Sequence, residues 1–159
     1  MTIAPAPYAL ITPEGDLTIG DQAVDFRDLL GPEGAARVPL RSYASVRGEW
    51  AGWVNDCSLL NGMPHNVVGS LVLLGFGGVA QPYAGPVVLT GWEWGYGSEL
   101  RPLRVEQIDA IRALHADARR AADLDDSPSP TPGWVVEARK VAAEIRAMPT
   151  PGITFGVIS

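Results

Sequence analysis

The side chains that could perform covalent catalysis lie together in one short segment, Gly52 to Gly75. It contains Cys57, the single cysteine of the chain, with Asp56 before it and His65 eight residues after it. A thiolate, an imidazole base and a carboxylate that orients the base are the parts of a cysteine nucleophile. However, a turn signal separates Cys57 from His65, and no nucleophile signature surrounds either residue. The sequence favours structural roles for both and predicts no catalytic residue.

Metal and phosphate chemistry is not indicated elsewhere in the sequence. The two histidines and the cysteine lack the spacing of metal ligands, and Asp123, Asp125 and Asp126 lack the calcium-loop pattern. The glycine-rich segment 75–78 follows a predicted helix, whereas a dinucleotide-binding loop follows a strand and opens a helix. We therefore expect no metal site and no cofactor.

The aromatic residues give a stronger signal for binding. Tryptophan is enriched at interface hot spots, so these residues favour the core or an interface. A pocket for a flat ligand is the alternative, although ligand pockets normally have convergent polar groups. Alternation along a strand would put the second aromatic group, 92–96, on one face. The candidate binding residues, including three polar ones nearby, are Trp50, Trp53, Asn55, Asp56, Asn66, Trp92, Trp94 and Tyr96.

Composition narrows the class of protein. The chain has 159 residues, of which 47% are apolar, and this is typical of one folded domain. A net charge of −6 makes nucleic-acid binding an unlikely function. No apolar stretch reaches ~18 residues, so we expect no membrane span. The start lacks a secretory pattern and one cysteine forms no internal disulfide, so the expected location is the cytoplasm.

The first half of the chain predicts strands and one short helix. Residues 8–12 form a strand, turn chemistry at 13–16 follows, and a second short strand comes next. Asp25 is the predicted cap of a helix that Gly31 ends. The predicted strands further on are 37–46, half-buried with Pro39 near an edge, and a strand that ends at Asn55 and Asp56.

The second half is mainly helical. A helix begins near Asn66, with Asn66 or His65 as its predicted N-cap and with Val67, Val68, Leu71 and Leu74 on one face. A buried strand follows at 87–90. An amphipathic helix is predicted over 105–122, with an apolar face made of Ile108, Ile111, Leu114, Ala118 and Ala121. A proline-rich linker over 123–132 follows, and Thr131 and Pro132 open a second helix. The apolar face of that helix consists of Trp134, Ala138, Val141, Ile145 and Met148, and a final strand is predicted after it.

These elements predict an α+β fold. A small mixed or antiparallel sheet with one or two packed helices forms a core domain over 1–100, and a two-helix extension follows over 101–159. Each extension helix has one apolar stripe. If the stripes face each other, little apolar surface remains to hold the pair on the core. We therefore expect a homodimer or larger oligomer with these helices and some tryptophans in the interface. A monomer with the helices on its own sheet is the alternative.

Two segments resemble a known family. Val54 to Leu74, followed by Gly85 to Gly91, is similar to small domains of unknown function of the DUF 3846 type, common in bacteriophages and bacterial mobile elements. The shared layout includes a Pro-x-Asn segment, here Pro64 to Asn66, that opens a helix. The resemblance covers Tyr8 to Gly91 and implies no known activity. It implies a phage or prophage accessory protein, and eleven arginines against one lysine agree with a GC-rich actinobacterial host.

Two function classes therefore stay open. The first is a non-catalytic accessory protein that contacts a host, phage or defence protein. The second is a small-ligand-binding protein, for a nucleotide or another metabolite, or an enzyme, that uses the tryptophan-rich segments and the loop from Asn55 to Asn66.

Overall fold

The chain folds as a sheet with helices packed on it. The computed structural model describes residues 6–40, 50–58, 60–79, 81–93, 99–122 and 133–148. Within them a six-stranded antiparallel sheet has the order β2-β1-β5-β4-β3, and β6 also pairs with β5. This confirms the predicted α+β class. The elements are β1 (Ala9–Ile11), β2 (Leu17–Ile19), α1 (Phe26–Leu30), β3 (Ala35–Pro39), β4 (Trp50–Asn55), α2 (Val67–Gly75), β5 (Val87–Glu93), β6 (Glu99–Arg101), α3 (Val105–Ala121) and α4 (Gly133–Ala147).

Local signals set the N-terminal elements. In the β1–β2 turn, the Thr12 carbonyl accepts a hydrogen bond from the Gly15 amide, and the Thr12 amide donates to the Asp16 carbonyl. Gly15 adopts a φ of 92°, which glycine tolerates at no steric cost. The Asp25 side chain accepts a hydrogen bond from the Asp28 amide, and α1 ends at Gly31 with a φ of 120°. The predicted cap at Asp25 and the predicted helix end at Gly31 are both confirmed. Pro39 ends β3 at the edge of the sheet, where a missing amide donor does little harm.

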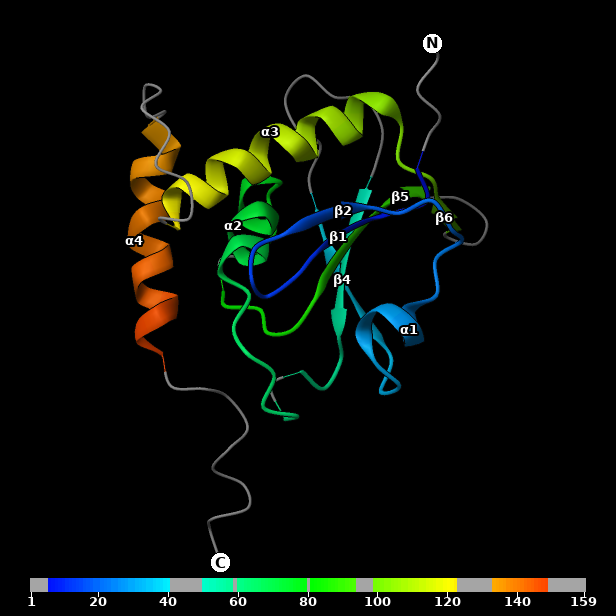
Figure 1. Cartoon of the computed structure of the whole chain (residues 1–159), viewed down its shortest axis with the longest axis horizontal. Coiled ribbons are helices and arrows are strands. Elements are labelled where there is room, and N and C mark those ends of the chain that lie inside the picture. Colours follow the sequence, from blue (N-terminus) through cyan, green and yellow to red (C-terminus); the bar gives the residue numbers. More distant parts are fainter. Residues whose placement is uncertain are drawn as a thin grey trace, which may run out of the picture.

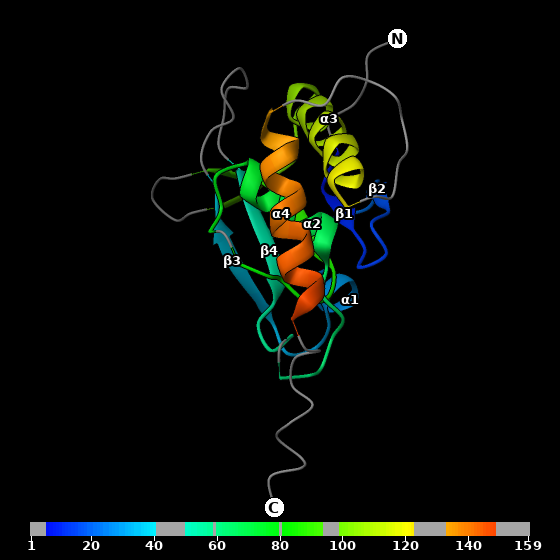
Figure 2. The same cartoon turned by 90° about the vertical axis from the view of Figure 1, so that its left-hand side faces the viewer.

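Helix α2 is buried on almost every side. Figure 1 shows it between α4 and the sheet, with α3 crossing it, and Figure 2 shows α4 standing in front of it. The predicted single face is therefore wrong in detail, because Val67 and Leu74 are half-buried while every residue from 68 to 73 is buried. Close approach depends on glycine. A Cβ on Gly52 would lie 2.5 Å from Leu73, and one on Gly75 would lie 2.6 Å from Leu114.

Asn66 connects three parts of the structure at the start of α2. Its side-chain oxygen accepts the Gly69 amide at 2.8 Å, which caps the helix as predicted. Its side-chain nitrogen donates to the carbonyls of Ile11 and Gly85, each at 2.9 Å. The side chain is fully buried, with 0% exposure. A single amide thus joins the end of β1, the segment before β5 and the first turn of α2.

The two C-terminal helices pack on this same chain. All five predicted inward residues of α3 are buried and belong to the apolar cluster that also contains β1, β5 and α2 side chains. Helix α4 adds Ala138, Ala142 and Ile145, all buried, whereas Met148, predicted on the same face as Ile145 and lying just beyond the last residue of α4, is 40% exposed. The α3 stripe is covered within one chain, and so is the described part of the α4 stripe except Met148. The division of domains at residue 100 stays a prediction.

Several predictions lie outside the described residues. Among the described residues, none of the helices has the length and apolar character needed to cross a membrane. The predictions that fall elsewhere concern Trp94, Tyr96, the strand beyond Leu40, the linker 123–132, the helix start at Thr131 and Pro132, and the final strand; Trp134 lies in α4, but its side chain is not described.

Replacing Asn66 with Ala should lower the free energy of unfolding by about 3 kcal/mol or more. The change removes three buried hydrogen bonds, and each contributes ~0.5–1.5 kcal/mol, or ~1–3 kcal/mol where its loss leaves a buried group without a partner. Asn61→Ala is the matched control, because exposed Asn61 makes one side-chain bond, to Glu33 at 2.7 Å. Urea denaturation measures both variants. Equal, small losses would contradict the role given to Asn66.

Candidate functional site

The structure separates the predicted binding residues by the face of the sheet on which they lie. Trp50 is 2% exposed and packs against Phe76 of the helical layer, with ring centroids 4.2 Å apart. Trp53 lies three residues later on the same strand and therefore points to the opposite face. Trp92 lies on that opposite face as well. The candidate tryptophans do not form one site, because Trp50 belongs to the core under α2.

Trp53 and Trp92 form the centre of an aromatic cluster. The ring centroids of Trp53 and Trp92 are 5.5 Å apart, and those of Trp53 and Phe26 are 4.7 Å apart. The Arg37 guanidinium lies 5.0 Å from the centroid of the Trp92 ring, within cation–π range. Trp53 is 9% exposed, whereas the other three residues are half-buried. The cluster thus has a fixed base and an accessible rim.

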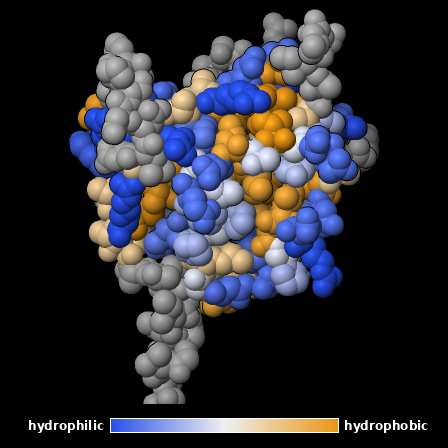
Figure 3. Space-filling model, in the orientation of Figure 1, coloured by the Kyte–Doolittle hydropathy of each residue, from blue (hydrophilic) through white to orange (hydrophobic). Residues whose placement is uncertain are grey.

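We call the surface around this cluster the aromatic face. Tyr8, Leu10 and Leu29 pack partly exposed against its buried base. Leu100 lies directly opposite Trp92 in the β5–β6 register and is 40% exposed. Figure 3, which views the molecule from the β1–β2 edge of the sheet, shows hydrophobic side chains among hydrophilic ones on that side. The aromatic face consists of Tyr8, Leu10, Phe26, Leu29, Arg37, Trp53, Trp92 and Leu100.

A buried hydrogen bond fixes the base of the aromatic face. The Trp53 indole nitrogen donates to the Thr90 hydroxyl oxygen at 2.9 Å, and Thr90 is fully buried. Because a buried indole N–H needs an acceptor, this bond sets the tilt of the ring under Phe26 and Trp92. The orientation of the exposed rings therefore depends on the β4–β5 pair.

Asn55 holds the end of β4 rather than facing a ligand. It is 2% exposed, and its side-chain nitrogen donates to the Leu30 carbonyl at 2.8 Å and to Glu33 at 2.9 Å. Its oxygen accepts the Cys57 amide at 2.7 Å. The hydrogen bond from Asn55 is the main reason that the pKa of Glu33 is lowered, so this carboxyl stays ionised. Asp56 follows in the turn and is exposed.

A pocket of about 350 Å³ lies beside this turn. Cys57, which is half-exposed, lines it together with Asp56 and Tyr83. Burial raises the pKa of Tyr83, so its phenol stays protonated at neutral pH. The lining contains Asn55 but no tryptophan, so the predicted polar and aromatic candidates lie in different places. In the described part of the chain, no three His, Cys, Asp or Glu side chains are placed to hold a metal ion.

Sequence reasoning found Trp53 and Trp92 and missed the other six members of the aromatic face, Tyr8, Leu10, Phe26, Leu29, Arg37 and Leu100. The sequence contained a signal for Arg37, since the residue alternates with inward-facing Val38 in a half-buried strand. Phe26 had none, because its contact with Trp53 depends on how α1 folds back over the sheet. The separation of Trp50 from Trp53 was also readable, because residues an odd number apart in a strand point to opposite faces.

Replacing Thr90 with Val should lower the free energy of unfolding by about 1–3 kcal/mol. The two side chains have similar shapes, but Val leaves the buried indole N–H of Trp53 without an acceptor. Thr18→Val on β2 is the control, because Thr18 is exposed and should change stability by less than ~0.5 kcal/mol. Thermal and urea unfolding, followed by tryptophan fluorescence, compare the two. A loss no larger than that of the control would disprove the anchoring role.

Comparisons with known proteins give no relative for this chain. No family model matches the sequence. No curated protein and no solved structure matches it either. The resemblance to domains of the DUF 3846 type therefore stays a hypothesis that rests on the sequence segments themselves.

Proposed function

We propose that this chain is a non-catalytic accessory protein that binds another protein through the aromatic face. The observation that carries the proposal is the half-buried Trp92 ring, held between Trp53 and the Arg37 guanidinium. Tryptophan and arginine dominate interface hot spots, and such residues act best when their neighbours hold them rigid. The family resemblance extends the proposal to a phage or prophage protein that acts on a host or defence factor in the bacterial cytoplasm.

The placement of the polar candidates supports binding over catalysis. Asn55 and Asn66, two of the three polar binding candidates, direct their side chains at groups of this chain itself. A group engaged in this way cannot also reach a substrate without breaking the fold. The aromatic rim, in contrast, offers apolar area and a cation at the surface. The small-ligand alternative finds less support, because among the described residues that line the pocket beside Cys57, Tyr83 is the single aromatic one.

A second copy of the chain is a natural first partner. The α3 stripe and Ala138, Ala142 and Ile145 of α4 are buried within one chain, so these residues do not require a neighbouring subunit. If a homodimer forms, the aromatic face is the surface that we propose for its interface. A two-fold axis would then bring the same patch of each chain together.

Replacing Trp92 with Ala should abolish partner binding while the fold persists, because Trp92 lies at the rim and Trp53 at the base. The experiment compares proteins retained by immobilised wild type, Trp92→Ala and Lys140→Ala from a bacterial lysate. Lys140 is the control, since it is exposed on α4, away from the aromatic face. We expect specific partners to be lost only with Trp92→Ala, at a cost of at least tenfold in affinity, about 1.4 kcal/mol or more. Retention of the same proteins by all three would refute the proposal.

Light scattering at micromolar concentration tests the homodimer. We expect twice the 16.9 kDa chain mass for the wild type and the single mass for Arg37→Glu. A carboxylate in place of the guanidinium over Trp92 would be buried without a partner in a two-fold interface. A wild-type mass near that of one chain would exclude the dimer but leave binding to a different protein open.

A further inference from the structure

A second surface site lies between the β1–β2 turn and helix α3, apart from the aromatic face. It is an open groove with a volume of about 420 Å³, within the usual range of small-ligand sites. Three basic side chains of α3, Arg112, His115 and Arg119, line it together with Asp16 and Leu17. Their spacing of three and four residues places the three on one side of the helix. The groove thus gathers cationic groups in a chain whose net charge is −6.

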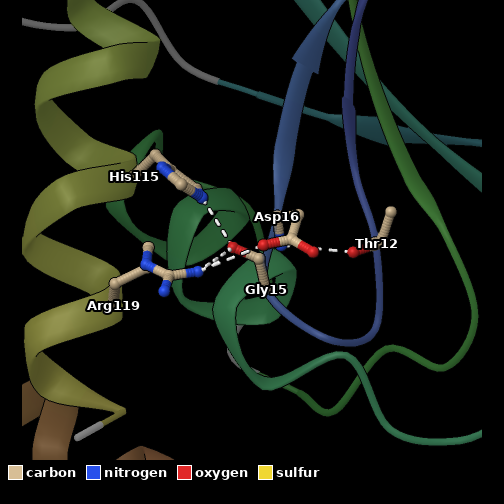
Figure 4. Close-up of polar contacts among 5 residues, drawn as sticks. All are labelled: Thr12, Gly15, Asp16, His115 and Arg119. Carbon is tan, nitrogen blue, oxygen red and sulfur yellow. Dashed lines mark hydrogen bonds and ion pairs between the residues drawn. The ribbon is translucent and has the colours of Figure 1, made fainter. Parts of the chain in front are cut away.

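The turn fixes two of these side chains in place. The carbonyl oxygen of buried Gly15 lies 2.8 Å from His115 Nε2 and accepts a hydrogen bond from Arg119 Nη1 at 2.9 Å (Figure 4). Because a carbonyl can only accept, His115 carries its proton on Nε2. Both side chains reach from α3 to the hairpin across about a hundred residues of sequence. Their positions are therefore set before any ligand arrives, which reduces the entropy lost on binding.

Arg112 has no comparable structural task. It is exposed on α3, and in the part of the chain that the structure describes it takes part in no ion pair. Neither the hairpin nor the helix needs its guanidinium for support. Arg112 and Arg119 lie seven residues apart on α3 and both line the groove, an arrangement suited to an anion between them.

We propose that this groove binds a small phosphate monoester, with its phosphate between Arg112 and Arg119. A guanidinium presents paired N–H donors that match phosphate oxygens, and two of them balance the charge of about −1.5 to −2 of a monoester at pH 7. A monocarboxylate would balance only one. Leu17 offers an apolar contact for the organic part of the ligand. The groove volume exceeds that of a phosphate alone, which favours an ester over the inorganic ion.

Asp16 occupies the place of the anion when the groove is empty. Its carboxylate lies 3.6 Å from Arg119 Nη1, and its side chain is 73% exposed. An exposed ion pair at this distance is worth little, so a phosphate can displace the carboxylate at small cost. Asp16 therefore lowers the affinity of the groove, and its removal should strengthen binding.

The pKa of His115 should change when the ligand binds. Burial lowers its pKa, assisted by the charge of Arg119, while the Gly15 carbonyl and the Asp16 carboxylate act in the opposite direction. Arg112 is the other charged group that lines the groove. A dianion between the two guanidinium groups adds negative charge beside the imidazole and favours its protonated form. Binding should therefore raise the pKa of His115. No such change is expected if His115 serves only to join α3 to the β1–β2 turn.

The test is a titration of the full chain with glycerol 2-phosphate, and with acetate at the same ionic strength, followed by NMR of the His115 ring. We expect saturable shifts with the phosphate ester and none with acetate. Arg112→Ala should weaken binding about tenfold to a hundredfold, and Asp16→Asn should strengthen it about two- to fivefold. Arg139→Ala is the matched control, because Arg139 is exposed on α4 and outside the groove.

Thermal unfolding provides a second measurement. The ester should raise the melting temperature of wild type and of Arg139→Ala but not that of Arg112→Ala. Equal responses in all variants, equal shifts with acetate, or an unchanged His115 pKa at saturation would each overturn the proposal. Because Trp92 does not line the groove, Trp92→Ala should bind the ester normally, so this result and the test of the aromatic face can fail independently.

Discussion

The side chain of Asn66 is the constraint on which the arrangement of the layers depends. It is fully buried and makes hydrogen bonds to a β1 carbonyl, a carbonyl before β5 and the first turn of α2. Its backbone amide also donates to the Tyr83 carbonyl at 2.8 Å. The side-chain hydrogen bonds of Asn66 are all buried, where a hydrogen bond is not readily replaced by one to water. The position of α2 over the sheet is therefore specified by directional bonds, in addition to apolar contact.

Apolar contact alone could not orient α2. The segment from Val67 to Leu74 is apolar at nearly every position, so a rotation of the helix would bury almost the same area. Steric limits remove that freedom. Gly52 admits the Leu73 side chain on the sheet side, and Gly75 admits Leu114 on the α3 side. Because of these two close approaches and its capped end, α2 fits on the sheet in one rotation about its own axis. The same close packing then buries the α3 stripe, with Ala138 and Ala142 of α4, on the chain's own core.

Local signals in the sequence were sufficient for most elements and insufficient for the candidate site. Asp25 and Asn66 have side chains that cap a helix within three residues, so the sequence alone predicts both helix starts. The α3 stripe was readable because charges occupy its other face. The aromatic face was not, because it joins residues of α1, β3, β4 and β5 whose proximity depends on strand order. The single-face prediction for α2 failed for the related reason that a helix covered on all sides has no polar face to reveal its orientation.

The excess of arginine over lysine also gains a physical explanation beyond codon composition. Arg37 lies over the Trp92 ring, Arg119 donates to the Gly15 carbonyl, and Arg146 donates to the Ala122 carbonyl at the end of α3. Each contact uses the flat guanidinium, whose fixed donors and weak hydration suit stacking and carbonyl binding at partly buried positions. The compact ammonium of lysine, more strongly hydrated, would lose more on leaving water. Cations of this chain therefore connect its parts as well as charge its surface, whereas Arg112 makes no such connection and lines the groove between α3 and the β1–β2 turn.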